Sequence, residues 1–373
     1  MTIIYWCHNL SSKRLRNRKN ISGVSMKNYV NGLNVGGWIS QYFNKRYEHF
    51  DSFIVEKDFE KIASWGFDHI RLPFDYEILE NKENPFVFNE RGFKYLDNAV
   101  LWSKKYGISL LLDMHSAPGF SFGSYEVSTL FKNKTQQEIY IKLWETIALR
   151  YKNEKHIAFD LLNELVLPSP DPWNNLVREC IASIRKVDTE RLLIFGGINY
   201  NSIFTLKDIE IYDDENIAYT FHFYEPIIFT HQKAVWMPFL VHYNQTLNYP
   251  GAFDNLDKLV SDVKDGKIGD IEQFDVKRYL TKELDISLMI EDMQPAIDFI
   301  NKTGRKLYCG EFGVIESTPM RSRINWCRDA ISLFDRYKIG RSYWTYKGMD
   351  FGLLDRKGNL ISEDLVKVLA GRR

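Results

Sequence analysis

The feature that most constrains the fold is a regular alternation of short apolar runs with longer amphipathic segments. Eight apolar runs have the length and composition of strands: 31–38, 68–74, 108–115, 157–162, 191–196, 217–224, 306–311 and 341–346. Helical periodicity marks the segments 56–64, 91–106, 135–152, 172–187, 324–337 and 363–369. Strands that alternate with helices in this way predict βαβ units and a parallel sheet. Eight of them within 373 residues predict an α/β protein, a single (β/α)8 barrel.

Local signals support several of these boundaries. Gly66 and Gly107 follow two of the predicted helices, where glycine commonly ends a helix. Thr135, with Glu138 three residues later, has the pattern of a capping box and predicts the start of the helix over 135–152.

One interval of the pattern is too long for a single helix. Residues 225–305 separate the sixth predicted strand from the seventh, which is more than twice the length that one helix needs. A long structureless loop is uncommon in a compact domain. We therefore predict an inserted subdomain at about residues 231–289, between strand 6 and helix 6, with helices over 253–263 and 285–292. Since it follows the carboxyl end of a strand, it should lie on the face where barrels carry their active sites.

The N-terminal segment lacks clear periodicity. We predict a disordered arm over residues 1–28, followed by one catalytic domain over 29–373; Met26 also fits an alternative start of the chain. The first apolar stretch precedes the basic residues, the reverse of a secretory signal, so we expect a cytoplasmic protein; export by an unusual route stays open as the alternative.

Charge and cysteine content exclude several classes of protein. Lys+Arg and Asp+Glu both number 49, so the chain has no basic bias, and it contains neither a basic amphipathic stretch nor an apolar run of transmembrane length. We therefore expect neither a nucleic-acid nor a membrane partner, and we expect a monomer. Cys7, Cys180, Cys309 and Cys327 form no CxxC pair, so neither a zinc site nor a disulfide framework is predicted. Cys180 and Cys309 lie in apolar segments and should be buried free thiols.

Polar residues gather where the predicted strands end. They are Arg71, His115, Asn163, Glu164, His222, Tyr224, Glu311 and Trp344. Each alone could be structural, but the carboxyl ends of barrel strands meet at one mouth, where barrel enzymes hold their reacting groups. Asn34-Val35-Gly36 stands where a metal-dependent barrel hydrolase would have His-x-His, and the paired glycines lack a phosphate-loop context. No metal or other cofactor is predicted.

This ordered set resembles glycoside hydrolase family 5, the large cellulase family of the clan A barrels, over about residues 29–372. Longer stretches (GLNVGGWISQ, HIRLPFDY, LYCGEFGVI) are similar to clostridial endoglucanases of the cellulase C type, which also carry a helical insertion after strand 6. Leu165 departs from the family, which more often has Pro or Val after the Asn-Glu pair.

The resemblance implies a retaining mechanism with two carboxyl groups about 5 Å apart. Glu164 would be the general acid and base, with His222 beside it and a raised pKa, and Glu311 the nucleophile. The remaining set would bind the substrate or hold the nucleophile: Arg71 and Tyr224 at Glu311, Asn163 at the sugar 2-hydroxyl, His115 at other hydroxyls and Trp344 beneath the ring. Trp38, Phe120 and Trp236 are weaker candidates for further subsites, since scattered aromatic residues more often serve packing.

The expected activity is endo-hydrolysis of β-1,4-glucan, as oligosaccharide or as cellulose-type or mixed-linkage polysaccharide. Two alternatives stay open. One is another β-glycan, such as mannan or β-1,3-glucan, or exo-attack, because specificity lies in loops and does not follow from the fold. The other is an inactive carbohydrate-binding protein, which loss of either glutamate would favour.

Overall fold

The computed structural model describes residues 26–42, 47–121, 128–269, 271 and 274–371. Most of the predicted N-terminal arm, residues 1–25, lies outside this range, and its last residues, Met26–Asn28, form a short 3-10 helix. Cys7 also lies outside it. Cys180, Cys309 and Cys327 are buried free thiols, which confirms the prediction for Cys180 and Cys309.

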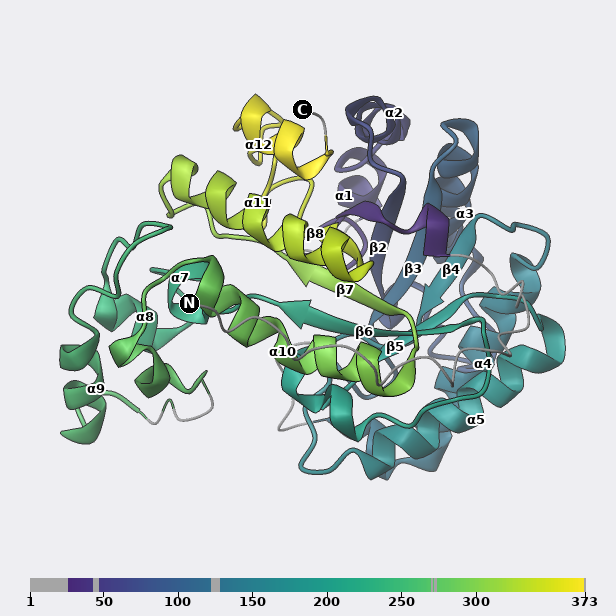
Figure 1. Cartoon of the computed structure of the whole chain (residues 1–373). Helices are drawn as coiled ribbons and strands as arrows, with labels where there is room; N and C mark the ends of the chain where they lie inside the picture. The colour runs from purple at the N-terminus through teal and green to yellow at the C-terminus, as the bar shows by residue number, and fades with distance from the viewer. Residues whose placement is uncertain (1–25, 43–46, 122–127, 270, 272–273, 372–373) are drawn as a thin grey trace, which may run out of the picture.

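Eight parallel strands form a closed barrel in sequence order, with β1 paired to β8 (Figure 1). The strands are β1 (Asn31–Asn34), β2 (His69–Asp75), β3 (Ser109–Ser116), β4 (Ile157–Asp160), β5 (Leu193–Gly196), β6 (Ile217–Phe223), β7 (Leu307–Phe312) and β8 (Gly340–Tyr343). The larger helices around them are α2 (Glu56–Trp65), α3 (Glu90–Lys105), α4 (Lys134–Arg150), α5 (Asp171–Val187), α10 (Ile286–Thr303) and α11 (Met320–Tyr337). Shorter helices are α1 (Tyr47–Ser52), α6 (Ile198–Asn201) and α12 (Glu363–Leu369). The predicted (β/α)8 fold is confirmed.

Three strands end two or more residues before their predicted carboxyl ends. The strands predicted over 31–38, 157–162 and 341–346 end at Asn34, Asp160 and Tyr343. The apolar residues beyond these points, such as Val35 and Leu161, are fully buried outside the sheet. An apolar run therefore continues past the strand wherever the loop above the barrel is also packed.

The start of α4 differs from the prediction as well. Asn133, not Thr135, is the N-cap, and its side chain accepts a hydrogen bond from the main-chain N–H of Gln136. Gly66 and Gly107 do follow α2 and α3, each with a positive φ, of 98° and 68°.

The barrel interior changes from apolar to polar along the strands. Leu111, Asp113 and His115 are alternate residues of β3, so their side chains share one side of the sheet. Leu111 packs in a small apolar cluster with residues of β4 to β7, whereas Asp113 contacts Arg71 of β2 across the interior. This gradient places the polar layers toward the carboxyl ends of the strands.

Between β6 and α10 the chain leaves the barrel. It forms α7 (Ile227–Thr230), α8 (Pro238–Tyr243), α9 (Leu256–Lys264) and a 3-10 helix, η7 (Val276–Thr281). We call residues 231–285 the insertion; Figure 1 shows α8 and α9 projecting beyond the barrel at the end to which β6 points. The helix predicted over 285–292 is the first half of α10, which continues through Pro295 to Thr303. Among the described helices, none is long and apolar enough to cross a membrane.

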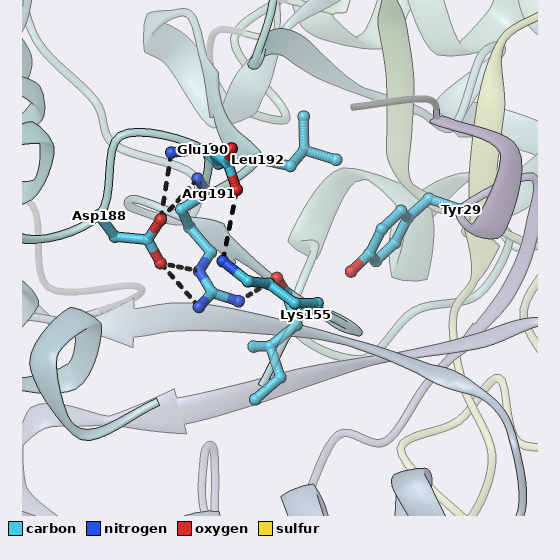
Figure 2. Close-up of a pocket in the computed structure, with 7 residues that line it drawn as sticks. Tyr29, Lys155, Asp188, Glu190, Arg191 and Leu192 are labelled. Atoms are coloured by element: carbon cyan, nitrogen blue, oxygen red, sulfur yellow. Dashed lines mark hydrogen bonds and ion pairs between the residues drawn. The ribbon is translucent and has the colours of Figure 1, made fainter. Parts of the chain in front are cut away.

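The end of the barrel opposite the insertion holds a small pocket beside Arg191 (Figure 2). Its guanidinium lies 2.8 Å from Asp188 and donates to the main-chain oxygens of Tyr151 and Ile157, while the Tyr29 ring lies across the pocket. The pocket has a volume of about 80 Å³. Typical ligand sites measure roughly 300–1,000 Å³, so this pocket belongs to the packing of the barrel base.

Candidate active site

Glu311 is held in place by two hydrogen bonds of different kinds. It lies within β7, and its side chain is 7% exposed. Nη1 of Arg71 lies 2.9 Å from its Oε1, and the hydroxyl of Tyr224, just after β6, donates to its Oε2 at 2.9 Å. A cation thus holds one oxygen of the proposed nucleophile and a neutral hydroxyl holds the other, so the side chain is fixed in orientation.

Glu164 lies in a contrasting environment. It follows β4 by four residues, and its Oε1 lies 2.5 Å from Nδ1 of His222. Burial raises the pKa of Glu164 to about 7; Asp113 adds to the rise, while His115 and Arg71 oppose it. Burial also lowers the pKa of His222 to about 3, so the imidazole is neutral near pH 7. A carboxyl that keeps its proton close to neutral pH can act as a general acid.

The backbone at Glu164 is in an uncommon conformation. Its φ of 34° lies in the left-handed region, which residues other than glycine seldom adopt. Such conformations cluster at functional sites, where the surrounding structure imposes them. The strand pattern of the sequence does not reveal this feature.

The two carboxyl groups face each other across a short gap. One oxygen of Glu164, one oxygen of Glu311 and a ring nitrogen of His222 all lie within 4.8 Å of one another. Nδ1 of His222 is also 3.7 Å from Oε2 of Glu311. Retaining glycosidases separate their carboxyl groups by about 5–5.5 Å, and inverting enzymes by at least about 6.5 Å. The separation therefore fits double displacement rather than direct attack by water.

Asn163, His115 and Trp344 form one wall of the site. Oδ1 of Asn163 accepts a hydrogen bond from Arg71 at 2.9 Å, and its Nδ2 lies 3.3 Å from Nε2 of His115. The His115 ring stacks on Trp344 with centroids 6.0 Å apart and an angle of 11° between the planes. A Cβ on Gly36 would lie 2.7 Å from the Trp344 ring, so the indole needs a glycine beside it. All eight predicted site residues thus lie in one connected group.

Three further polar residues support Arg71, and sequence analysis did not identify them. Arg71 is completely buried and lies 3.0 Å from Asp160, 3.1 Å from Asp113 and 3.1 Å from Oδ1 of Asn34. Oδ2 of Asp113 in turn lies 2.9 Å from Nδ1 of His115. The sequence does contain a signal for these residues: each is a polar residue at an inward-facing position of an otherwise apolar strand.

This layer holds three carboxyl groups around one cation. Burial raises the pKa of Asp113 and of Asp160, and Arg71 opposes the rise in both. For Arg71, burial acts to lower the pKa, but the three carboxylates of Asp113, Asp160 and Glu311 raise it. The guanidinium therefore stays charged beneath the site.

The weaker subsite candidates separate into two kinds. Trp38 is fully buried, stacks on Trp102 and donates its indole N–H to the main-chain oxygen of Phe50. Phe120 is 2% exposed. Trp236, at the start of the insertion, is 50% exposed, and its ring lies edge-on to His231, which contacts Tyr224. Of the three, Trp236 alone presents a large surface to solvent.

Glu164, His222 and Glu311 are also the group of described residues whose ligand atoms converge closely enough to hold a metal ion. The adjacent Arg71 places a fixed positive charge on Glu311, and His222 engages Glu164. The donor set is better matched to a sugar between two carboxyl groups than to a cation, and we assign no metal to it.

Comparisons with known proteins agree with this geometry. The sequence profile of the family described as cellulase (glycosyl hydrolase family 5) matches residues 24–350. A protein named Endoglucanase C from Acetivibrio thermocellus is 46% identical over 349 residues, covering 93% of this chain and 100% of that protein. Cellodextrinase A from Ruminococcus flavefaciens is 34% identical, covering 85% of each chain.

A solved structure shares the fold. It is Thermotoga maritima Cel5A in complex with cellobiose, which superimposes with a TM-score of 0.73 at 23% identity, covering 92% of this chain and 97% of that one. At this level of identity the likeness supports the barrel architecture.

Proposed function

The chain belongs to glycosyl hydrolase family 5, the cellulase family, and from this premise we propose that it is a retaining endo-β-1,4-glucanase that uses Glu311 as nucleophile and Glu164 as acid and base. The observation that carries the proposal is the pairing of two carboxyl groups within one sugar-sized gap but in unlike environments. Glu311 is bound by a cation and a hydroxyl, and Glu164 by a neutral imidazole.

In the first step, the Glu311 carboxylate attacks the anomeric carbon of a β-linked glucosyl residue. The bond from that carbon to the glycosidic oxygen breaks as Glu164 gives its proton to the leaving oxygen. An ester between Glu311 and the sugar results, with inverted configuration.

In the second step, the Glu164 carboxylate takes a proton from a water molecule, whose oxygen attacks the same carbon. The ester bond breaks, Glu311 is restored as a carboxylate, and the product has the original β configuration. Asn163, held by Arg71 and close to His115, is available to bind the 2-hydroxyl of the reacting sugar, a contact that strengthens in the transition state. Trp344 would supply an apolar face against that sugar.

Names of the relatives support a glucan substrate: Endoglucanase C and Cellodextrinase A are 46% and 34% identical to this chain. The test is incubation with carboxymethylcellulose, barley β-glucan, mannan and β-1,3-glucan, followed by measurement of reducing ends. We expect release from the first two, with a rapid fall in viscosity, and a β-anomeric first product by NMR. Release from mannan or β-1,3-glucan alone would assign the substrate to the competing glycans, and an α-anomeric first product would refute retention.

A further inference from the structure

A partly buried charge cluster joins the insertion to the residue that follows Tyr224. Arg278 and Tyr279 belong to η7 in the insertion, Asp292 belongs to α10, and Glu225 follows Tyr224 directly after β6. Nη2 of Arg278 lies 2.5 Å from Asp292 and donates to the Tyr279 hydroxyl at 2.7 Å. The Tyr279 hydroxyl donates to Oε2 of Glu225 at 3.2 Å.

The cluster contains one cation for two carboxyl groups. Asp292 is fully buried, and burial raises the pKa of Asp292 to about 7 and raises that of Glu225, while Arg278 opposes both shifts. Buried ion pairs are poor sources of stability, and breaking one leaves an uncompensated charge. A cluster of this kind is therefore better explained by what it holds in place than by the stability it adds.

Hydrogen bonds fix the main chain on both sides of this point. The Tyr224 carbonyl accepts a hydrogen bond from the Thr230 hydroxyl, and the Glu225 carbonyl accepts one from the Trp326 indole at 3.3 Å. With the Glu225 side chain held by Tyr279, main chain and side chain are anchored together. The Tyr224 hydroxyl, which donates to Glu311 at 2.9 Å, is carried by this anchored segment.

We propose that Arg278 and Tyr279 are positioning residues for hydrolysis: by holding Glu225 they fix the main chain at Tyr224 and keep its hydroxyl on the nucleophile. The inference rests on the proposed role of Glu311. It gives the insertion a function in the chemical step, because a misplaced group near the reacting atoms slows the reaction even when binding is intact.

A double-mutant cycle tests this coupling. We compare Arg278→Met, Tyr224→Phe and the double variant by kcat and KM on an aryl β-cellobioside. Tyr224→Phe should lower kcat roughly tenfold or more, the effect of a lost hydrogen bond to a charged group. Arg278→Met should lower kcat about fivefold in the parent and less than about twofold in the Tyr224→Phe background, since residues that act through one contact are not additive. KM should stay within about twofold throughout.

Two further variants keep the test decisive. Tyr279→Phe removes one oxygen, leaves the three charged side chains in place and replaces Arg278→Met in the cycle if that variant does not fold. Lys282→Met, which removes an exposed ion pair with Glu291 just after η7, is the matched control and should leave kcat unchanged. Effects that multiply, or a loss confined to KM, would overturn the inference while leaving the hydrolase function standing. A parent protein that cleaves no β-glucoside would overturn the proposed function and this inference with it.

Discussion

Arg71 and Arg191 are both buried in the barrel, one near each end of its strands, and their surroundings differ. Arg191 meets one carboxylate, that of Asp188 (Figure 2). It also donates to main-chain oxygens, which include those of Tyr151 and Ile157. Arg71 meets three carboxylates, those of Asp113, Asp160 and Glu311. At the base, one carboxylate pairs with the Arg191 cation, whose other donors bind main-chain oxygens. Beneath the active site, carboxyl groups outnumber the Arg71 cation.

The difference shows that one end of the barrel contributes to stability and the other end to chemistry. A cation that is paired with one carboxylate and has its other donors hydrogen-bonded has one favourable arrangement. A change in the protonation of its neighbours would not stabilise that arrangement. Excess carboxyl groups in a buried layer instead share protons near neutral pH, because burial raises their pKa values. The catalytic end therefore accepts an electrostatic cost that the base avoids.

The largest expected effect belongs to Glu164 at the catalytic end. Glu164→Gln should lower kcat on β-1,4-glucan by about 10⁴-fold, because the leaving oxygen then has no proton donor. A dinitrophenyl β-cellobioside, whose leaving group needs no proton, should lose much less in the first step. Steady-state and single-turnover rates on both substrates measure this, and equal losses on the two would contradict the role of acid.

Arg71→Met should have the next largest effect, and it tests the arginine beneath the active site. Loss of its contacts to Glu311 and Asn163 should lower kcat/KM by about 10³-fold, since several charge-assisted hydrogen bonds at the reacting centre disappear together. Kinetics on a soluble glucan measure the effect. An active enzyme within about tenfold of the parent would mean that Glu311 is held by Tyr224 alone.

Arg191→Met should produce the opposite result. Asp188 would be left buried without its partner, so the free energy of unfolding should fall by about 3 kcal/mol. The turnover number per folded molecule should be unchanged, because the site lies at the other end of the strands. Chemical denaturation and kcat, measured on the same samples, would separate the effect on stability from the effect on turnover. A loss of kcat in fully folded Arg191→Met would contradict the contrast between the two arginines.

The smallest effect is a difference in the pH dependence of stability between the parent and Glu164→Gln. A carboxyl group whose pKa is raised from 4.5 to about 7 on folding stabilises the native state at low pH, and that contribution is lost as pH rises through 7. From pH 5 to pH 8 the parent should lose about 2 kcal/mol more than the variant. Asp113 and Asp160 titrate in both proteins, so most of their contribution cancels when the free energy of unfolding of parent and variant is measured at the two pH values. An equal loss of stability in both proteins would contradict the raised pKa of Glu164.

The sequence was most informative where residue type and strand position agreed. His115, Glu164 and Glu311 could be placed because polar residues stood at or just after the ends of apolar runs, and parallel strands bring those ends together. Asn34, Asp113 and Asp160 were missed because each stands within an apolar run, where one polar residue resembles a tolerated exception. Only the packed barrel shows that they meet around Arg71.

Other misses have equally local causes. The helix predicted over 285–292 is too short, because α10 continues to Thr303 through Pro295, a residue that on its own favours a break. The cap of α4 is Asn133 rather than the predicted Thr135, and both residue types cap helices well. The cluster of Arg278, Asp292 and Glu225 joins residues far apart in the chain, and no spacing rule links them.

The most direct measurement is covalent trapping of the nucleophile. A 2-deoxy-2-fluoro β-cellobioside with a good leaving group should form the first ester and react slowly with water, because fluorine destabilises the oxocarbenium-like transition state. Digestion and mass spectrometry of the inactivated protein should place the sugar on Glu311, and Glu311→Gln should take up none. A label on Glu164 or another residue, or full turnover without any trapped ester, would contradict the assignment of the two carboxyl groups.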